Sequence, residues 1–344
     1  MRSAVIGVGS LGTIIGALIT QNGGQIDLVD TYQPTINVLR EKGASVTGTM
    51  KLQVPVSACH IDELEGVYDL FLITTKQTAL HDLMPRLLLH MHSDSLVLTL
   101  QNGIPEELVA DYVGRARTAG CTVGWGATWL EPGVSRLTST MKVMECFAFE
   151  IGEIDGSDTP RIRAARDLLN LVGHTDISDN LMGIRWTKLL MNATFSGMSA
   201  ALCATFGQVL NDEVTLRCVA HIADETVRVA NACGVRLVHM QGKDFEQLRL
   251  NSPAEIPAKF SFYHEVWDQH AALKASMLQD LEKGRATEID FINGLVCKKG
   301  RELHIPTPYN NKVVELVKRQ EQTGVRHSML DKSEFLNLLS LDQE

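Results

Sequence analysis

A single lysine interrupts the apolar segment "IRWTKLLMN", which spans residues 184–192. Helical spacing would place Lys188, Asn192 and Ser196 four residues apart, on one face of a largely apolar helix. A desolvated ammonium can donate a hydrogen bond, and then its proton, to a carbonyl oxygen that is becoming an alkoxide. The same spacing also fits a lysine whose stem lies along a buried helix while its charged end reaches the surface. The stretch by itself leaves both interpretations open.

A glycine-rich stretch, "VIGVGSLGTIIG", occupies residues 5–16 and has GxGxxG spacing directly after an apolar run. In a dinucleotide-binding turn the first glycine allows the tight turn and the second lets the backbone approach the phosphates. The third glycine lets helix and strand pack closely. An ordinary glycine-rich turn between strand and helix is the alternative. The candidate cofactor-binding residues here are Gly7, Gly9, Ser10, Leu11 and Gly12.

Asp30 ends the next apolar run, "QIDLVD", about 20 residues after the glycines. A carboxylate at this place accepts hydrogen bonds from the adenosine ribose and repels a 2′-phosphate, and no arginine directly follows the run. Asp30 therefore favours NAD(H) over NADP(H). The alternative is an aspartate that caps the helix expected to follow.

Two further polar clusters follow apolar runs, in "ITTKQTA" (73–79) and "TLQNGIPEEL" (99–108). Ligands of parallel sheets bind outside the carboxyl ends of the strands, so both clusters are expected to face the cofactor. Lys76 also fits a solvated loop lysine, and Asn102 also fits a simple turn residue before glycine. The candidate cofactor residues of these clusters are Thr74, Thr75, Lys76 and Asn102, with Asn102 also a candidate for the substrate.

The first half of the chain alternates apolar runs with stretches of helical spacing, which is typical of a doubly wound α/β sheet. The expected strands are 3–9, 25–30, 68–74 and 95–100, and the expected helices are 10–22, 33–42, 77–90 and 105–113. Residues 117–152 change character, and "TVGWGATWLEPGVSRLTS" and "MKVMECFAFEIGE" are expected to form antiparallel strands around a turn at 131–133.

From about residue 180 the apolar spacing becomes helical almost throughout. The expected helices are 181–205, 211–234, 265–284 and 287–302, with a loop at 251–261 and a short helix and frayed tail in "DKSEFLNLLSLDQE". The sequence thus predicts two domains. They are a Rossmann-type dinucleotide-binding domain over residues 1–180 and an all-helical substrate-binding and catalytic domain over residues 181–344.

Composition excludes several classes of protein. Hydrophobic residues make up 44% of the chain, and a net charge of −9 gives no basic surface for nucleic acid. The seven cysteines lack metal-ligand spacing and fit reduced thiols, so no metal site is expected. No apolar run is long enough to span a bilayer. We expect a cytoplasmic enzyme with a small-molecule substrate and no membrane or nucleic-acid partner, and a homodimer is left open.

Several blocks together resemble the ketopantoate reductase (2-dehydropantoate 2-reductase) family. They occur in the family's order over nearly the whole chain: "GVGSLG" (7–12), "QNG" (101–103), "RWTKLLMNATFSGMSAAL" (185–202), "SMLQDLEKGRATEIDFINGLV" (276–296) and "HIPTPYN" (304–310). The resemblance implies that Lys188 is the catalytic general acid and that Asn192 binds the substrate.

The same resemblance implies roles for two residues of the 276–296 block. Glu288 matches the family's acidic active-site residue, which would hold the lysine or a substrate hydroxyl and contact the cofactor. Its alternative is a glutamate favoured by the start of a helix. Ser276 is similar to the serine that binds the substrate carboxylate, and its alternative is a helix cap.

Three positions depart from the family pattern. Ser196 and Leu273 each stand where an asparagine of the substrate pocket is usual, and Asp30 replaces the basic signal of NADPH-using members. The chemistry is therefore expected to be retained while the pocket is altered. A serine and a leucine at these positions favour a substrate with fewer hydroxyls and more apolar bulk than ketopantoate.

The sequence predicts a nicotinamide-dependent oxidoreductase that interconverts a 2-oxo acid and a 2-hydroxy acid by hydride transfer. One alternative is an NAD-dependent D-2-hydroxyacid dehydrogenase with a substrate other than pantoate. The other is a non-catalytic protein that senses a dinucleotide. A sensor needs neither a proton donor nor a carboxylate anchor, so the joint presence of Lys188, Asn192, Ser276 and Glu288 favours an enzyme.

Overall fold

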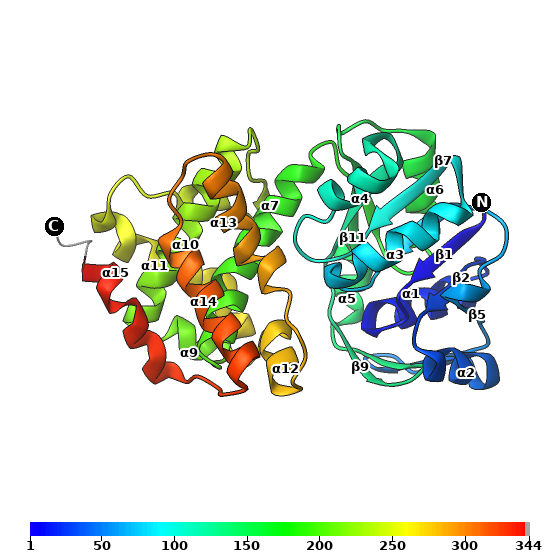
Figure 1. Ribbon diagram of the computed structural model, residues 1–344, viewed down its shortest axis with the longest axis horizontal. Coiled ribbons are helices and arrows are strands. Elements are labelled where there is room, and N and C mark those ends of the chain that lie inside the picture. The colour runs from blue at the N-terminus through cyan, green and yellow to red at the C-terminus, as the bar shows by residue number, and fades with distance from the viewer. Residues whose placement is uncertain (341–344) are drawn as a thin grey trace. The chain divides into compact units, whose positions relative to one another are not determined.

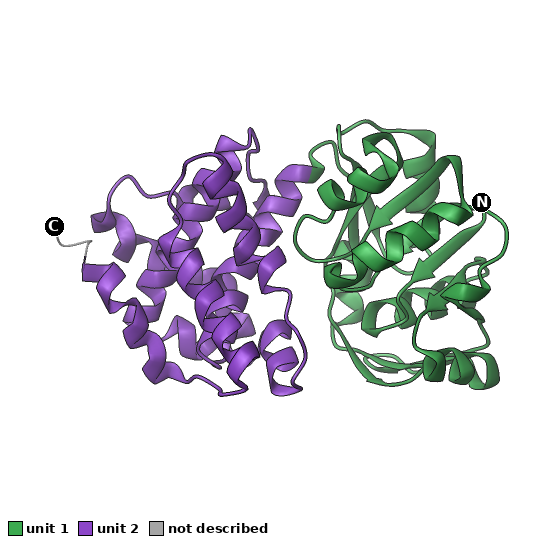
Figure 2. Ribbon diagram, viewed as in Figure 1, with its two compact units in different colours: residues 1–181 green, residues 182–344 purple. Residues whose placement is uncertain are grey.

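The computed structural model describes residues 1–340 and divides into two compact units. Unit 1 comprises residues 1–181 and unit 2 comprises residues 182–344, of which 341–344 lie outside the described residues (Figure 2). Within the described part of the chain, no helix is both long and apolar enough to cross a lipid bilayer.

Unit 1 is built on an eight-stranded sheet, and every pairing in it is parallel except that of β11 with β8. Its strands, in spatial order, are β12 (Thr175–Ile177), β11 (Phe149–Glu153), β8 (Thr118–Val123), β7 (Met91–Thr99), β6 (Tyr68–Ile73), β1 (Ser3–Ile6), β2 (Asp27–Asp30) and β5 (Ser57–His60). The strand order reverses between β1 and β6, where ligands of such sheets bind.

Helices cover both faces of this sheet, as Figure 1 allows the reader to follow. One apolar core includes residues of α1 (Ser10–Gln21), α2 (Gln33–Lys42) and α6 (Pro160–Leu169). The other core, across the sheet, includes residues of α3 (Leu80–Leu87) and α4 (Glu106–Val113). The predicted doubly wound α/β fold is confirmed.

A second sheet of four strands packs against α1. Its strands, in spatial order, are β4 (Leu52–Val54), β3 (Ala44–Gly48), β10 (Val134–Leu137) and β9 (Ala127–Glu131). The antiparallel pair around the turn at 131–133 is confirmed by β9 and β10. The strand predicted over "MKVMECFAFEIGE" is wrong at its start, because α5 (Met141–Phe147) precedes β11. A short apolar run fits either a strand or a buried helical turn, and periodicity does not separate them.

In the described residues of unit 2, up to residue 340, the strands are those of a two-stranded ribbon, β13 (His239–Met240) and β14 (Lys243–Asp244), and the other elements are helices. The first helix, α7 (Leu181–Met191), continues through a π-helical turn (Asn192–Ser196) into α8 (Gly197–Ala201). The others are α9 (Phe206–Leu210), α10 (Glu213–Ala232), α11 (Ile256–Trp267), α12 (Ser276–Glu282), α13 (Asn293–Glu302), α14 (Pro308–Thr323) and α15 (Leu336–Ser340).

Two expectations for unit 2 need correction. The helix predicted over 265–284 is instead the end of α11, an irregular segment and α12, and α11 begins inside the predicted loop at 251–261. Pro257 stands in the first turn of α11, where proline's fixed backbone angle suits a helix start. No helix was expected over 308–323, where α14 lies. The predicted short helix near the C-terminus corresponds to α15, and the predicted frayed tail falls in 341–344, outside the described residues.

Candidate functional site

The three glycines of the GxGxxG turn play different parts in unit 1. Gly7 has a φ of +97°, and a Cβ on it would lie 2.8 Å from the Thr75 backbone nitrogen. A Cβ on Gly12 would lie 2.1 Å from the Gly7 carbonyl oxygen. A Cβ on Gly9, in contrast, would meet no atom within 4 Å. The fold itself therefore requires two of the glycines, while Gly9 leaves open space beside the turn.

The turn leads directly into α1, whose first turn has no capping side chain. Ser10 and Leu11 are the first two residues of this helix, and both are partly exposed. Gly9 occupies the N-cap position, and the first turn contains no acidic residue. Backbone N–H groups at a helix start, with no acidic residue in the first turn, suit an anionic ligand such as a pyrophosphate.

The Asp30 carboxylate fixes the glycine-rich turn from the end of β2. Its Oδ2 accepts a hydrogen bond from the Val8 backbone N–H at 2.6 Å, and its Oδ1 accepts one from the Tyr32 N–H at 2.8 Å. Asp30 is not the N-cap of α2, because Tyr32 occupies that position. The capping alternative is therefore wrong, and a carboxylate oxygen with two lone pairs can accept a further hydrogen bond from a ligand.

A cavity of about 280 Å³ opens at the carboxyl ends of β1 and β2, entirely within unit 1. Its lining residues are Ile6, Gly7, Asp30, Thr31, Ile61, Thr75, Ala79, Asp82, Leu83 and Arg86. The aliphatic side chains offer apolar walls to a flat ring, and Asp30 lies among the polar groups. Arg86 forms an ion pair with Asp62, so its positive charge is compensated.

Thr74 and Thr75 follow β6 and brace the turn. The Thr74 hydroxyl donates to the Gly7 carbonyl oxygen at 2.6 Å, which gives this side chain a structural task. Thr75 lines the cavity, and its hydroxyl accepts a hydrogen bond from Gln101 at 3.3 Å. A direct contact of either threonine with a cofactor stays a prediction.

Lys76 and Asn102 lie on the loops that follow β6 and β7. Lys76 is partly exposed and occupies the cap of a short 3₁₀ helix (Gln77–Ala79), whereas the Asn102 side chain is exposed. The buried Gln77 side chain donates to the Asn102 carbonyl oxygen and so ties the two loops together. Gln77 was not among the sequence candidates, because a glutamine in a loop gives no signal of its own.

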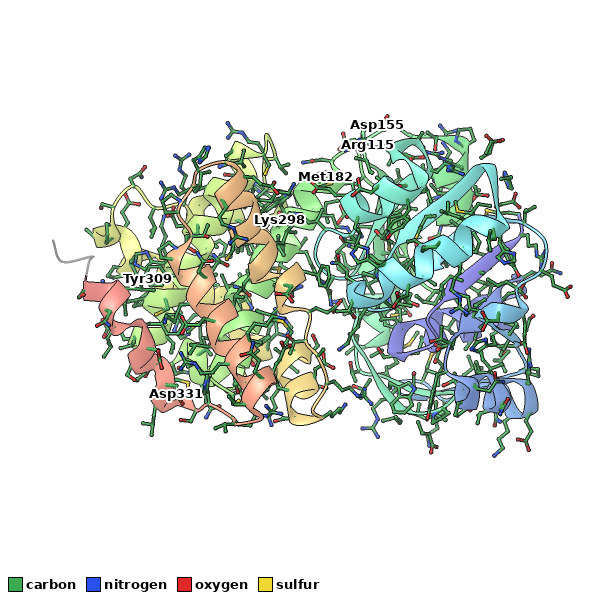
Figure 3. All side chains as sticks on the ribbon, viewed as in Figure 1. Arg115, Asp155, Met182, Lys298, Tyr309 and Asp331 are labelled. Atoms are coloured by element: carbon green, nitrogen blue, oxygen red, sulfur yellow. The ribbon has the colours of Figure 1, made fainter. Side chains whose placement is uncertain are left out.

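Lys188, Asn192 and Ser196, which the sequence predicts on one face of a helix, form what we call the polar stripe, and all three lie on the first helical segment of unit 2. Between Leu181 and Ala201 most residues are buried, and the partly exposed ones are Met182, Lys188, Met191, Asn192 and Ser196. Met182, which is labelled in Figure 3, lies near the start of α7, more than one helical turn before Lys188. The candidate acid and both candidate substrate residues therefore reach the surface of a helix that is otherwise packed on all sides.

The stripe runs across the π-helical turn. The Gly197 N–H would bond the Ala193 carbonyl in an α-helix, but it donates to the carbonyl oxygens of Asn192 and Thr194. The Thr194 hydroxyl donates to Leu190 and Met191 carbonyls, at 2.8 and 3.0 Å. Single π turns inside α-helices occur frequently at functional sites. The sequence interpretation assumed an uninterrupted α-helix and missed this turn.

Ser276 and Glu288 lie on two other segments of unit 2. The segment of α12, which begins with Ser276, packs against α8 and against the π turn. Ser276 is exposed and makes no capping hydrogen bond at the helix start. Glu288 is partly exposed and occupies the N-cap position of a 3₁₀ turn (Ile289–Phe291), although its side chain makes no capping hydrogen bond there. The capping alternative for Ser276 does not fit, whereas Glu288 does stand at a helix start, as its alternative assumed. The catalytic and binding roles of both residues remain predictions.

Leu273, which departs from the family pattern, lies on the irregular segment before α12. Its side chain is 52% exposed, and its carbonyl oxygen accepts a hydrogen bond from the Phe206 N–H at 3.0 Å. The residue is therefore held by its backbone, and its apolar side chain is open to solvent or to a ligand.

Behind the stripe lies a buried polar group that the sequence interpretation did not contain. Glu225 of α10 accepts hydrogen bonds at 2.9 Å from the N–H groups of Tyr309 and Asn310, in the first turn of α14. Tyr309 is labelled in Figure 3. Burial raises the pKa of Glu225 to about 7, although the N–H donors favour its carboxylate. A glutamate in a long helix gives no signal in the sequence that it is buried.

Comparison with known proteins places the chain in a family. Residues 3–146 match the family described as Ketopantoate reductase PanE/ApbA, and residues 180–321 match its C-terminal part. The chain belongs to the ketopantoate reductase family. The resemblance drawn from the sequence blocks is therefore confirmed.

Individual family members are distant but match over almost their whole length. A 2-dehydropantoate 2-reductase of Streptococcus pyogenes serotype M3 is 27% identical over 320 residues, which cover 92% of this chain and 97% of that protein. A PanE/ApbA family ketopantoate reductase from Ralstonia eutropha JMP134 has the same fold, with a TM-score of 0.79, 23% identity and coverage of 94% and 99%. The structure of D-mandelate dehydrogenase with NADH and anilino(oxo)acetate matches with a TM-score of 0.77 and 24% sequence identity. The match covers 94% of this chain and 99% of that protein.

Proposed function

We propose that the protein is a nicotinamide-dependent oxidoreductase that reduces a 2-oxo acid to a 2-hydroxy acid. The observation that carries the proposal is the polar stripe. Lys188, the amide of Asn192 and the hydroxyl of Ser196 are partly exposed on a helix that is otherwise mostly buried. The relatives named 2-dehydropantoate 2-reductase support the same class of reaction.

Unit 1 fits the nicotinamide cofactor. The glycine-rich turn leaves open space at Gly9, α1 begins without a side-chain cap, and the adjoining cavity combines apolar walls with the Asp30 carboxylate. The D-mandelate dehydrogenase of the same fold was solved with NADH. A bound reduced nicotinamide supplies the hydride. We assign Gly7, Gly9 and Gly12 to the turn that receives the pyrophosphate.

Unit 2 supplies the acid and the substrate contacts. The Lys188 ammonium donates a hydrogen bond to the keto oxygen and passes its proton there as negative charge develops. Asn192 and Ser196 hold polar groups of the substrate from the same face of the helix. Ser276 receives the substrate carboxylate, and Glu288 orients the ammonium or a substrate hydroxyl.

The cofactor preference that this site supports is NADH over NADPH. The Asp30 carboxylate would accept hydrogen bonds from the ribose hydroxyls and would repel a 2′-phosphate. Arg86 also lines the cavity, but its ion pair with Asp62 leaves little net positive charge for a phosphate. Both observations point in the same direction.

A second candidate is the oxidation of a D-2-hydroxy acid with an apolar side chain. It is favoured by the small Ser196 on the stripe and by the half-exposed Leu273 beside α12. Together these residues offer fewer hydrogen-bonding groups than two asparagines would. A dinucleotide sensor without turnover finds no such support.

A panel of 2-oxo acids assayed with NADH and NADPH, and of the matching 2-hydroxy acids with NAD⁺, tests both candidates. We expect NADH-dependent reduction of at least one 2-oxo acid, with apolar side chains preferred over ketopantoate. If the protein binds NADH but turns over none of these pairs, the non-catalytic dinucleotide sensor would be the remaining candidate function. Light scattering on the same preparation tests whether the protein is a homodimer, which the sequence leaves open.

A further inference from the structure

The π turn of unit 2 leaves one backbone acceptor to be satisfied from outside the helix. The Gly197 N–H donates to Asn192 and Thr194 carbonyls, so the Ala193 carbonyl loses the partner that an α-helix would give it. Ala193 is fully buried, and a buried carbonyl without a hydrogen bond is destabilising because it has lost its hydration without gaining another donor. A π turn at this place is therefore stable only with a donor from elsewhere.

Asn293, the first residue of α13, supplies that donor. Its Nδ2 donates to the Ala193 carbonyl oxygen at 2.9 Å, across 100 positions of sequence. The space for this side chain exists because residue 197 is glycine, since a Cβ there would lie 2.6 Å from the Asn293 Oδ1. Asn293 is fully buried, and its Oδ1 has no hydrogen-bond partner among the described residues. Its amide group is thus held by its two N–H bonds alone.

The direction of the Asn293 amide is set by a chain of hydrogen bonds that starts at Glu225. The ionised carboxylate can only accept, so the Asn310 side chain must turn its Nδ2 toward it, at 2.7 Å. The Asn310 Oδ1 then faces the other way and accepts from the Asn293 Nδ2 at 2.9 Å. With its NH₂ fixed as a donor toward Asn310, Asn293 directs its second N–H to Ala193. The carboxylate on α10 thereby decides which end of each amide faces the π turn.

We propose that Asn293 is a positioning residue that holds the π turn, and with it Asn192 and Ser196, in the arrangement that binds the 2-oxo acid. Glu225 and Asn310 act through it. Because an α-helical continuation would shift the register after Ala193 by one residue, loss of the brace would rotate Ser196 relative to Lys188. This inference rests on the proposed function for its kinetic consequence, but the state of the π turn can be measured without any substrate.

The variant Asn293→Leu removes the donor at nearly constant volume. At pH 8, above the pKa of about 7 that burial gives Glu225, we expect KM for the best 2-oxo acid to rise roughly tenfold or more, with a smaller change in kcat. NADH affinity, measured by fluorescence titration, should stay within about twofold, because unit 1 is untouched. Amide hydrogen exchange should become faster over residues 193–198. Unchanged KM and unchanged exchange in this variant would overturn the proposal.

Two further variants separate positioning from general damage. Gly197→Ala keeps every polar group but displaces the Asn293 amide, so it should reproduce the KM rise and the faster exchange, and it stands in if Asn293→Leu does not fold. Thr215→Val is the matched control, since it deletes another buried donor of unit 2, to Val209 at 2.7 Å. The control should lower thermal stability without moving KM. A KM rise of the same size in Thr215→Val would mean that any loss of packing acts in this way, and the inference would fail.

The outcome remains readable if the proposed function is wrong. A wild-type protein that reduces no 2-oxo acid ends the functional proposal, while faster exchange at the π turn in both Asn293→Leu and Gly197→Ala still shows that Asn293 braces it. Normal activity in the wild type with unaltered exchange and KM in both variants ends the positioning inference alone.

Discussion

The candidate cofactor site of unit 1 and the candidate catalytic site of unit 2 are built on different principles. In unit 1 the site is largely backbone: a turn of three glycines, the start of α1, and one carboxylate that fixes the turn. In unit 2 it consists of side chains on a buried helix, and their spacing depends on a π turn that is braced from α13. A site made of backbone is determined by adjacent residues, whereas a site made of side chains also depends on residues far away in the sequence.

This difference predicts how each region should respond to substitution. Adding a methyl group should disturb the backbone site, since glycine leaves room only for the chain itself or for a ligand. Removing a functional group should impair the side-chain site, because that group makes the contact with the substrate. The fold should be kept, because the helix would remain packed without the group. The effects should also stay within their own unit: cofactor affinity should follow changes in unit 1, and turnover and substrate affinity should follow changes in unit 2.

The largest effect is expected from Lys188→Ala. Hydride transfer builds negative charge on the substrate oxygen, so an ammonium beside it matters more in the transition state than in the ground state. We expect kcat to fall by a factor on the order of 10²–10⁴, with NADH affinity and the folded spectrum unchanged. Lys298→Ala, which removes an exposed lysine of α13 labelled in Figure 3, is the control and should be fully active. Full activity of Lys188→Ala on the best substrate would disprove the assignment of the acid.

The two glycines Gly12 and Gly9 provide a sharper test within unit 1. A Cβ on Gly12 would overlap the Gly7 carbonyl oxygen, so Gly12→Ala should destabilise the protein by roughly 1–3 kcal/mol and abolish tight NADH binding. A Cβ on Gly9 meets only open space, so Gly9→Ala should keep its thermal stability and still weaken NADH binding about tenfold or more. Thermal unfolding and NADH titration measure both. Normal NADH affinity in Gly9→Ala would show that the space beside Gly9 does not receive the pyrophosphate.

The same contrast explains what the sequence could predict. The doubly wound sheet, the glycine turn and Asp30 are local patterns, so a strand, a turn and a helix follow from adjacent residues. The stripe of Lys188, Asn192 and Ser196 is also local, and it is present. The hydrogen bond that supports the stripe is not local, because Asn293 donates to the Ala193 carbonyl across 100 positions of sequence. Nothing in "TFSG" indicates a π turn.

Errors in the predicted elements have a related cause. The apolar residues before β11 and around α11 fit more than one type of element, and the choice is made by the surface on which they pack. The cavity residues from α3, including Leu83 and Arg86, were missed because their separation from the glycines in sequence hides their proximity in the fold. The residues that directly follow β2 in the sequence include no arginine, and they give no sign of Arg86, which reaches the cavity from α3.

A moderate effect is expected on cofactor preference. Asp30→Ala removes the carboxylate that we propose accepts hydrogen bonds from the ribose, and it should narrow the ratio of NADH to NADPH catalytic efficiency by roughly tenfold. Asp62→Asn should act in the same direction but less, because it frees Arg86 of its ion pair and leaves its positive charge for a 2′-phosphate. Steady-state kinetics with both cofactors measure the ratio. A wild-type protein with equal or better efficiency with NADPH would contradict the role of Asp30.

The smallest effect is expected from Ser276→Ala. The serine is exposed at the start of α12, so its deletion leaves no buried gap and should not alter thermal stability. If its hydroxyl donates one hydrogen bond to the substrate carboxylate in both ground and transition states, the loss is uniform binding, which appears in KM. A hydrogen bond to a charged group contributes roughly 1.5–3 kcal/mol, and water can replace part of it here, so we expect KM to rise several-fold with kcat nearly unchanged. Competitive binding of a 2-hydroxy acid should weaken by the same factor. A fall in kcat as large as that of Lys188→Ala would instead place Ser276 in the proton transfer, and the division between an acid on α7 and an anchor on α12 would be wrong.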